Sequence, residues 1–322
     1  MDKRFGWAYI GSGSIAQKTA KQILGTGDHK IVSVWSHHKE NADTFAKKYN
    51  CLAFENMEDA IRTQGVEGVY IATPHTAHFN NALLALKCQK PVLIEKPITV
   101  NTKELEILLE YATKQNLYIG EAMWTKFNPL AKFINEYVEA GNIGDILEFD
   151  ASFCVWSPRR KRVIRPELGG GALLDLGVYP ITYSHMLLGK PSAIDAKTKL
   201  NKFGVDGDDK IKLTNKNNSV STISTSIFKY SSIQANIIGT KGKIKVPNFF
   251  SGNKATIISN GKKTVYKTGS SSYTYQFNKV AQDIRLGKLE SEEVQHKDSL
   301  EIMEIMDECR KQFGVYYEND RA

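Results

Sequence analysis

A glycine-rich loop near the start of the chain constrains its fold more than any other feature. Gly11-Ser12-Gly13-Ser14-Ile15-Ala16 fits the pattern G-x-G-x-x-A, after an apolar run typical of a strand and before a stretch typical of a helix. The first glycine allows a tight turn, the second allows the backbone to approach a pyrophosphate, and Ala16 allows close packing of helix on strand. The helix N-terminus adds N–H donors and a positive dipole. The loop therefore predicts a dinucleotide site formed by Gly11, Ser12, Gly13, Ser14 and Ile15. A glycine-rich turn without a ligand is the alternative.

Short apolar runs and amphipathic stretches alternate over the first 120 residues. We expect buried strands over residues 7–10, 31–35, 69–72, 92–94 and 117–120, with helices between them. Strands that are apolar on both faces and alternate with helices are typical of a parallel sheet covered on both sides. Residues 1–121 are therefore predicted to form a doubly wound α/β Rossmann domain.

The pattern changes after residue 121. Helices are expected over residues 130–140, from the glycine run at 169–171 to residue 188, and over 275–286 and 298–312, with an irregular basic loop before the glycine run. Residues 192–267 show strand-like alternation broken by turn signals. Consecutive strands without intervening helices favour an antiparallel sheet. We therefore expect residues 122–322 to form an α+β substrate-binding and oligomerisation domain with a large, mainly antiparallel, open-faced sheet. Its C-terminal helix could pack back near the first domain.

Composition limits the class of protein. The chain has 322 residues, enough for two domains, and 43 Lys and Arg against 35 Asp and Glu give a net charge of +8. The lysines are interpreted as spread along the chain and mostly interleaved with acids, without an extended basic tail, so nucleic acid is not expected as a partner.

The cysteines and the apolar segments indicate the compartment. The four cysteines lie far apart, and this spacing predicts buried thiols rather than a disulfide framework or a zinc ribbon. The apolar stretch at residues 5–10 is too short for a signal peptide, and no segment reaches the length of a membrane span. We expect a cytoplasmic protein with no membrane partner.

The end of the second expected strand bears on the choice between NAD and NADP. An acid there hydrogen-bonds the ribose 2′-hydroxyl in NAD-binding proteins. Here Trp35 is followed by Ser36, His37, His38 and Lys39, with no acid before Glu40. A hydroxyl, imidazoles and an ammonium suit a 2′-phosphate better, through charge-assisted hydrogen bonds. Ser36, His37 and Lys39 therefore favour NADP over NAD, although solvated residues at a helix start are the alternative.

Three further segments carry polar groups to the same region. Thr73-Pro74-His75-Thr76-Ala77-His78 follows one expected strand, and Glu95-Lys96-Pro97 follows the next. Ligands of doubly wound sheets bind beyond the carboxyl ends of the strands, so Lys96 is expected to project toward the site that the glycine loop defines. The third segment, residues 169–179 (GGGALLDLGVY), lies in the second half.

Together these segments resemble the glucose–fructose oxidoreductase/inositol dehydrogenase (Gfo/Idh/MocA) family of NAD(P)-dependent oxidoreductases. The resemblance covers essentially the whole chain, and the E-K-P motif is its most specific part. The run at residues 121–127 (EAMWTKF) and Tyr179 look most like the dimeric dihydrodiol dehydrogenase branch, whereas many inositol-type relatives have His at the position of Tyr179.

The resemblance implies that Lys96 and Tyr179 carry proton transfer. Oxidation of an alcohol moves a hydride to nicotinamide while the hydroxyl loses a proton, so a base must be in place. The pKa of a free tyrosine is about 10, and a nearby ammonium would lower it. Asp175 lies four residues before Tyr179, on the same face if both are helical, and could bind a substrate hydroxyl or orient Lys96. The alternatives are a surface lysine for Lys96, a half-buried aromatic at a domain interface for Tyr179, and a helix-start acid favoured by the dipole for Asp175.

The resemblance also implies cofactor contacts. They comprise Thr73, Pro74, His78, Glu95 and Lys96 at the strand ends and Trp124, Lys126 and Arg165 further along the chain. His78 is expected to orient loops rather than to act in the reaction, and core packing is the alternative for Trp124. Arg165 belongs to the cluster at residues 159–165, for which closure over an anionic ligand and a solvated loop both remain open. No metal site is expected, because neither histidine pair has a third ligand in reach.

These features predict an NAD(P)-dependent oxidoreductase, preferably using NADP, that acts on a carbonyl or alcohol of a sugar, polyol or cyclic trans-diol. The alternative is a non-catalytic protein that senses NAD(P) or a sugar. The open sheet face of the second domain predicts a homodimer, with a tetramer as the second possibility.

Overall fold

The computed structural model describes residues 3–259 and 261–321. The chain divides into two compact units. The first contains the chain up to Trp124 together with Ser272–Ser299. The second contains Thr125–Ser271 together with the chain from Leu300.

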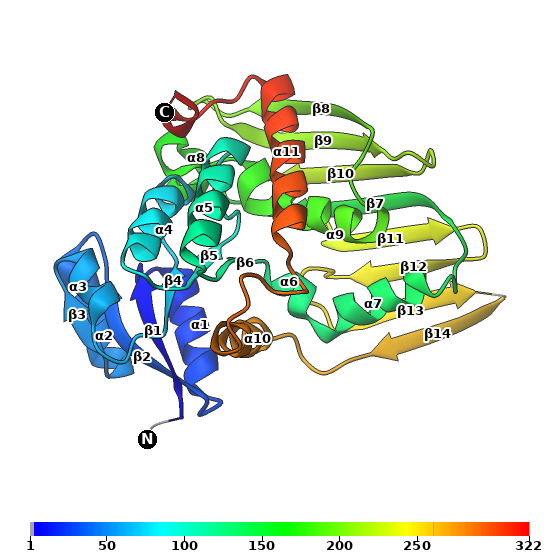
Figure 1. Ribbon diagram of the computed structural model, residues 1–322. Coiled ribbons are helices and arrows are strands. Elements are labelled where there is room, and N and C mark those ends of the chain that lie inside the picture. The colour runs from blue at the N-terminus through cyan, green and yellow to red at the C-terminus, as the bar shows by residue number, and fades with distance from the viewer. Residues whose placement is uncertain (1–2, 260, 322) are drawn as a thin grey trace. The chain divides into compact units, whose positions relative to one another are not determined.

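The first unit is a parallel sheet of six strands in the order β3-β2-β1-β4-β5-β6 (Figure 1). The strands are β1 (Phe5–Ile10), β2 (His29–Trp35), β3 (Leu52–Phe54), β4 (Gly68–Ile71), β5 (Val92–Glu95) and β6 (Ile119–Ala122). Its helices are α1 (Ser14–Leu24), α2 (Lys39–Tyr49), α3 (Met57–Arg62), α4 (His78–Lys87), α5 (Thr102–Gln115) and α10 (Thr274–Arg285), with a 3₁₀ turn at His75–Ala77. This strand order is that of a doubly wound dinucleotide-binding sheet, so the predicted Rossmann fold is confirmed.

An aromatic core holds this sheet against α10. All six residues of β1 are buried. The ring of Phe277 on α10 lies 5.1 Å from that of Trp7 and 5.0 Å from that of Tyr70, and Tyr70 in turn contacts Tyr9 at 4.9 Å. Strands apolar on both faces need such cover. The rigid core fixes the carboxyl ends of β1, β4 and β5, where the expected site residues lie.

The second unit is an eight-stranded sheet in the order β14-β13-β12-β11-β7-β10-β9-β8. The strands are β7 (Ile146–Cys154), β8 (Ala193–Leu200), β9 (Asp206–Thr214), β10 (Val220–Ser226), β11 (Gln234–Gly239), β12 (Gly242–Pro247), β13 (Lys254–Ser259) and β14 (Lys262–Lys267). Among the described strands of this sheet, β7 and β10 form the one parallel pair, so the mainly antiparallel sheet is confirmed.

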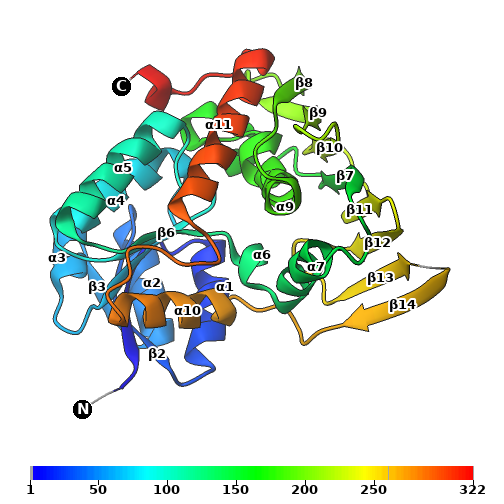
Figure 2. The same cartoon turned by 45° about the vertical axis from the view of Figure 1, so that its right-hand side comes forward.

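Helices cover one face of this second sheet. They include α7 (Pro129–Glu139) and α9 (Val178–Leu188), and α11 (His296–Phe313) runs near the C-terminus (Figure 2). Among the described elements of this unit, no helix lies on the opposite face (Figures 1 and 2). The open-faced sheet is therefore present.

The structure contains elements that the sequence pattern did not indicate. Strand β3 and helix α3 are short and were not expected. The basic loop contains the short helix α8 (Lys161–Ile164) and a 3₁₀ turn at Pro166–Leu168, and α6 (Trp124–Phe127) follows β6. The glycine run opens a π-helical turn at Leu173–Gly177 that leads into α9, not a continuous α-helix. Within the described residues, no helix combines the length and apolar character needed to cross a bilayer.

Candidate functional site

The glycine loop joins β1 to α1 beside β4. Gly11 has φ +107°, and a Cβ there would lie 2.5 Å from the carbonyl oxygen of Ala72, so only glycine fits. Gly13 precedes α1 and has no side chain with which to cap the helix, and a Cβ built on it would meet no protein atom within 4 Å. The first N–H groups of a helix need partners from outside the helix. The loop therefore leaves room and donors for an anionic group, which is what a dinucleotide pyrophosphate requires.

His78 connects the ends of two strands of the first unit. It is fully buried; its Nδ1 lies 2.9 Å from the carbonyl oxygen of Pro97, and its Nε2 lies 3.0 Å from that of Thr73. Burial lowers the pKa of His78 to about 4, against the raising effect of these contacts. A neutral ring has one N–H, so it donates to one of the two carbonyls. The geometry is that of a residue that holds the loops after β4 and β5 together.

The E-K-P motif ends β5. Glu95 is buried, and the hydroxyl of Tyr70 donates to its Oε1 at 2.5 Å. Burial raises the pKa of Glu95 to about 7, while the Tyr70 hydrogen bond and the Lys96 charge act in the opposite direction. Lys96 is half-buried, and the Lys96–Pro97 peptide bond is cis.

Glu121 on β6 supports the same segment and was missed by sequence reasoning. Its side chain is buried; Oε1 accepts from the Ile98 N–H at 3.2 Å, and Oε2 accepts from the Ser299 hydroxyl at 3.1 Å. A lone acid within an otherwise apolar strand was the available signal, because buried carboxylates require hydrogen-bond partners.

The end of β2 lies beside the glycine loop. The Ser12 hydroxyl donates to that of Ser36 at 3.0 Å, and the Gly11 N–H donates to the Trp35 carbonyl at 2.8 Å. Lys39, in the first turn of α2, pairs with Asp43 at 2.9 Å, and both side chains are exposed. His37 lies between these residues. The structure thus brings Ser36 to the loop and places Lys39 in an ion pair that is open to solvent.

The predicted contacts after β6 fall in different units. Trp124 ends the first unit and is buried, with its ring 4.4 Å from that of Tyr273. Lys126 belongs to the second unit and is half-buried. Arg165 also belongs to the second unit, where its guanidinium lies 4.0 Å from the ring centre of Phe203.

The second unit brings Asp175 and Tyr179 together with an arginine that the sequence did not single out. Arg162 donates to both carboxylate oxygens of Asp175, at 2.8 and 3.2 Å. Tyr179 is 8% exposed, and the ring centres of Phe153 and Phe250 lie 5.6 and 5.4 Å from its own. Asp175 lies in the π-helical turn and Tyr179 in α9, so the spacing argument for a plain α-helix does not transfer directly. The aromatic rings hold the tyrosine, and the bidentate pair holds the carboxylate.

The structure thus assembles two groups of predicted residues. In the first unit, the glycine loop, Ser36 and the ends of β4 and β5 come together, and in the second unit Asp175 and Tyr179 lie on one continuous segment with Arg162 beside them. Among the described residues, no group of three or more His, Cys, Asp or Glu side chains could hold a metal ion.

Two family models match the chain. The model of the oxidoreductase family with the NAD-binding Rossmann fold matches residues 5–122, and the GFO/IDH/MocA C-terminal domain matches residues 132–245.

Curated relatives match over nearly the full length. The chain is 30% identical to scyllo-inositol 2-dehydrogenase (NADP(+)) IolU of Bacillus subtilis over 98% of this chain and 99% of the relative. It is 29% identical to trans-1,2-dihydrobenzene-1,2-diol dehydrogenase of Xenopus tropicalis, over 97% and 98%. It is 28% identical to D-xylose 1-dehydrogenase (NADP(+)) of Hypocrea jecorina, over 97% and 92%.

A solved structure confirms the fold. The 3-ketoreductase KijD10 of Actinomadura kijaniata, in complex with NADP and TDP-benzene, aligns with a TM-score of 0.88 at 21% identity, over 96% of this chain and 98% of that one. With the family models and the full-length relatives, the chain belongs to the GFO/IDH/MocA family of NAD(P)-dependent oxidoreductases.

Proposed function

We propose that this oxidoreductase uses NADP to interconvert the alcohol and carbonyl of a sugar, polyol or cyclic trans-diol. The observation that carries the proposal is the glycine loop, where Gly11 is required by the close approach of Ala72 and Gly13 faces open space at the start of α1. The names of the relatives support the substrate class, since they are dehydrogenases of an inositol, a dihydrodiol and a sugar.

NADP would be held by the glycine loop and by side chains after β2, β4, β5 and β6. These residues are Gly11, Ser12, Gly13, Ser14, Ile15, Ser36, His37, Lys39, Thr73, Pro74, His78, Glu95, Lys96, Trp124, Lys126 and Arg165. His78 contributes by holding the loops after β4 and β5, as its two carbonyl contacts indicate. When bound, NADP supplies the hydride acceptor or donor.

The proposed proton-transfer residues are Lys96 and Tyr179. During oxidation, Tyr179 accepts the proton of the substrate hydroxyl, and during reduction it returns a proton to the nascent alkoxide. The Lys96 ammonium stabilises negative charge on the substrate oxygen and on the phenolate. Asp175, held in place by Arg162, accepts a hydrogen bond from a neighbouring substrate hydroxyl. The contacts of the Tyr179 ring with Phe153 and Phe250 limit the rotation of this ring.

The preference for NADP is proposed from the end of β2. An acid that would bind the ribose 2′-hydroxyl of NAD is absent from residues 35–39. Lys39 stands in the first turn of α2, and Ser36 is linked to the glycine loop through Ser12. Two of the relatives carry NADP(+) in their names.

Incubation of the purified protein with NADP and a panel of sugars, polyols and cyclic diols tests the proposal, with nicotinamide absorbance as the signal. Turnover on at least one of these compounds is expected. Nicotinamide binding without turnover on any of them, together with specific capture of a protein partner, would favour the regulatory alternative, which none of the named relatives supports. Thermal shifts with NADP and NAD in parallel test the cofactor preference.

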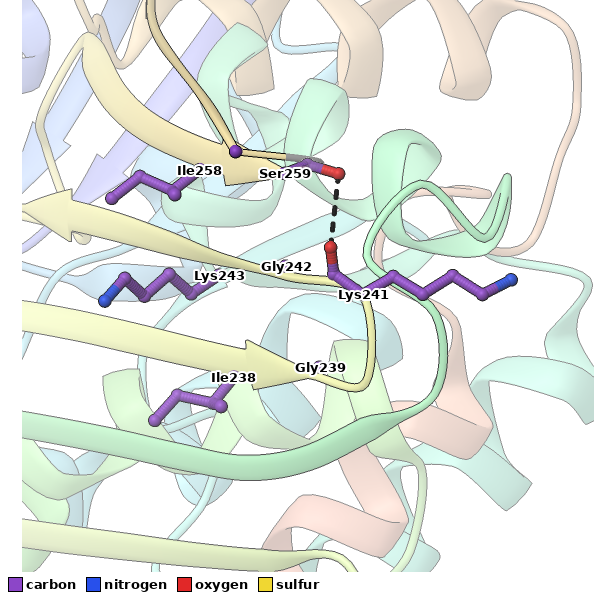
Figure 3. A pocket seen from close by; sticks show the side chains of 8 residues that line it. Ile238, Gly239, Lys241, Gly242, Lys243, Ile258 and Ser259 are labelled. Carbon is purple, nitrogen blue, oxygen red and sulfur yellow. Dashed lines mark hydrogen bonds between the residues drawn. The ribbon is translucent and has the colours of Figure 1, made fainter.

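We further propose a homodimer through the open face of the second sheet. The strand registers place Glu148 and Asp150 of β7 in the middle of this face. Lys243 and Lys245 of β12 lie on one side of them, and Lys210 and Lys212 of β9 lie on the other. Figure 3 shows Ile238, Lys243 and Ile258 pointing the same way from neighbouring strands, with Lys241 directed away from them.

Two copies packed face to face could set the acids of one copy against the lysines of the other. A face with charges of one sign would repel its own copy. Light scattering at several concentrations tests this, with a tetramer as the second possibility. Glu148→Lys with Asp150→Lys should weaken the dimer, and a monomer in the unaltered protein would overturn the proposal.

A cytoplasmic location is also proposed. The four cysteines are free, and Cys88, Cys154 and Cys309 are buried, as is common for proteins of reducing compartments. Fractionation of the cells that make the protein would test this.

A further inference from the structure

The segment that carries Asp175 and Tyr179 is bound at its beginning by side chains from distant parts of the chain. The N–H of Leu173, the first residue of the π-helical turn, donates to Oδ2 of Asp206 at 2.6 Å. Asp206 is fully buried at the start of β9. Ala172, the residue before the turn, has no polar side chain to cap it, so Asp206 provides the acceptor that a helix start needs.

The glycine run is matched to this carboxylate. Gly171 has φ +132°, and a Cβ on it would lie 2.3 Å from Oδ1 of Asp206. Any other residue would both strain the backbone and displace the acid. Gly171 and Asp206 are therefore complementary, because the missing side chain of Gly171 leaves the space that the Asp206 carboxylate fills.

A second buried acid fixes the first. The carboxyls of Asp206 and Asp209 act on each other's pKa, and the hydroxyls of Thr198 and Thr225 donate to Asp209 at 2.6 and 2.9 Å. Burial and the charge of Asp206 raise the pKa of Asp209 well above its usual value. Strands β8, β9 and β10 together set the position of the acceptor that faces Leu173.

The C-terminal part of the chain binds the same glycine run from another direction. The hydroxyl of Tyr317 donates to the carbonyl of Gly170 at 2.5 Å. Tyr317 is held in turn by Asp320, which accepts from its N–H at 2.8 Å and pairs with the buried Arg310 at 2.7 Å. The residues before and after Gly171 therefore have separate anchors, one in the sheet and one near the C-terminus.

We propose that Asp206 is a positioning residue for the oxidoreductase reaction, with Tyr317 as its counterpart, and that together they hold the π-helical turn so that Asp175 and Tyr179 stay in their reactive places. The inference rests on the proposed function, because it assumes that Asp175 and Tyr179 take part in the reaction. π-Helical turns are rare and need support from their surroundings, which these two side chains provide.

The first test is kinetic. Asp206→Ala removes the acceptor that faces the Leu173 N–H, and Tyr317→Phe removes the hydroxyl that donates to the Gly170 carbonyl. Each variant should lower kcat by about tenfold, since small misplacements of reacting groups are costly, while the Kd for NADP stays unchanged. Ser33→Ala is the matched control, because it deletes another buried side-chain-to-backbone hydrogen bond, from Ser33 to the Ala60 carbonyl at 2.6 Å in the first unit. Its turnover per folded molecule should equal that of the unaltered protein.

The second test does not need activity. Hydrogen exchange should become faster in peptides that cover residues 170–177 in both variants, and stay unchanged there in Ser33→Ala. The fold-loss of kcat in the double variant should be smaller than the product of the two single fold-losses, because both substitutions act on one segment.

Unchanged exchange at residues 170–177 in both variants would overturn the inference, even if turnover fell. Faster exchange with full turnover per folded molecule would also overturn it. If the unaltered protein turned over no sugar, polyol or diol while exchange at residues 170–177 was still faster in the variants, the proposed function would fail instead.

Discussion

The two units hold their proposed site segments in different ways. In the first unit, the supports are close in the sequence to what they hold: His78 reaches Thr73 and Pro97, five and 19 residues away. In the second unit, the π-helical turn is held by Asp206, 33 residues from Leu173, and by Tyr317, 147 residues from Gly170. The first arrangement is a property of local motifs, whereas the second depends on the complete fold of its unit. Variants in the glycine loop and at the end of β2 should therefore act on cofactor binding and local stability, and variants around the π-helical turn should act on turnover.

The largest expected effect is on turnover. Tyr179→Phe removes the proposed proton-transfer hydroxyl and keeps the aromatic contacts with Phe153 and Phe250. We expect kcat to fall by about 10²- to 10⁴-fold, the usual contribution of a positioned acid or base. NADP affinity should stay nearly unchanged, because the dinucleotide loop lies in the first unit. Steady-state kinetics and fluorescence titration with NADP measure the two quantities.

Tyr183 provides a matched control one turn further along α9. It is buried, and among the described residues its hydroxyl has no hydrogen-bond partner. Tyr183→Phe should leave turnover intact and should not lower stability, because an unpaired buried hydroxyl is costly. Equal losses of turnover and cofactor affinity in Tyr179→Phe would show that Tyr179 has a structural role. They would also contradict the expected separation of effects on cofactor binding from effects on turnover.

The second prediction separates two glycines of one loop. Gly11→Ala should lower the free energy of unfolding by about 1–3 kcal/mol, because φ is +107° and the new methyl would meet the Ala72 carbonyl. Gly13→Ala should change stability by less than about 1 kcal/mol, since φ is −67° and its Cβ meets no protein atom within 4 Å. Yet Gly13→Ala should weaken NADP binding about tenfold, because the methyl occupies the space proposed for the pyrophosphate.

Urea unfolding and NADP titration of both variants measure these effects. Unaltered NADP affinity in Gly13→Ala would contradict the proposed place of the cofactor, whatever Gly11→Ala does to stability.

The third prediction concerns two buried groups of the first unit with opposite pH dependence. Glu95 has its pKa raised from 4.5 to about 7, so folding takes up a proton in this range and stability falls as pH rises through it. His78 has its pKa lowered from 6.5 to about 4, so the unfolded chain takes up the proton and stability rises with pH between these values. Each group contributes at most about 1.4 kcal/mol per pH unit.

Between pH 5 and 6.5 the contributions of Glu95 and His78 to stability oppose each other. Substitution of either residue leaves the contribution of the other to be measured alone. Relative to the unaltered protein, Glu95→Gln should make the free energy of unfolding rise more steeply with pH, and His78→Asn should make it fall more steeply. Urea unfolding at several pH values measures the slopes. Parallel profiles for the three proteins would show that burial does not control the protonation of these groups.

The fold could be predicted because its signals are local. Apolar runs, the glycine turn and the change of rhythm after residue 121 each depend on neighbouring residues, and the sheets they predicted are confirmed. Strand β3 and helix α3 were missed because three to six residues give too short a pattern.

The candidate site was only partly accessible from the sequence. The resemblance indicates Arg165 within the basic cluster, and no motif marks Arg162, which in the fold reaches Asp175 while Arg165 lies against the ring of Phe203. Asp206 and Tyr317 have no motif of their own, because their partners are the backbone groups of Leu173 and Gly170, which any sequence contains.

Charge was also less evenly distributed than expected. From residue 210 to residue 282 the chain has lysines but no aspartate or glutamate, so the lysines there are not interleaved with acids along the sequence. The sheet restores the mixture in space, because β7 brings Glu148 and Asp150 between β12 and β9. Pairing of distant strands, and not sequence order, decides which charges are neighbours on this face.

The smallest expected effect tests whether α2 contributes to NADP preference. Lys39 and Asp43 form an exposed ion pair at 2.9 Å, and exposed pairs contribute little to stability. The ammonium can therefore leave Asp43 for a 2′-phosphate at little cost. Lys39→Ala should weaken NADP binding by about three- to tenfold and leave NAD binding unchanged, while Asp43→Asn should strengthen NADP binding by freeing the same ammonium. Both effects should shrink as salt is raised, because the site is open to solvent.

Parallel titrations with NADP and NAD measure the preference. Equal losses of NADP and NAD affinity in Lys39→Ala would place the 2′-phosphate site away from α2, leaving Ser36 as the contact beside the glycine loop.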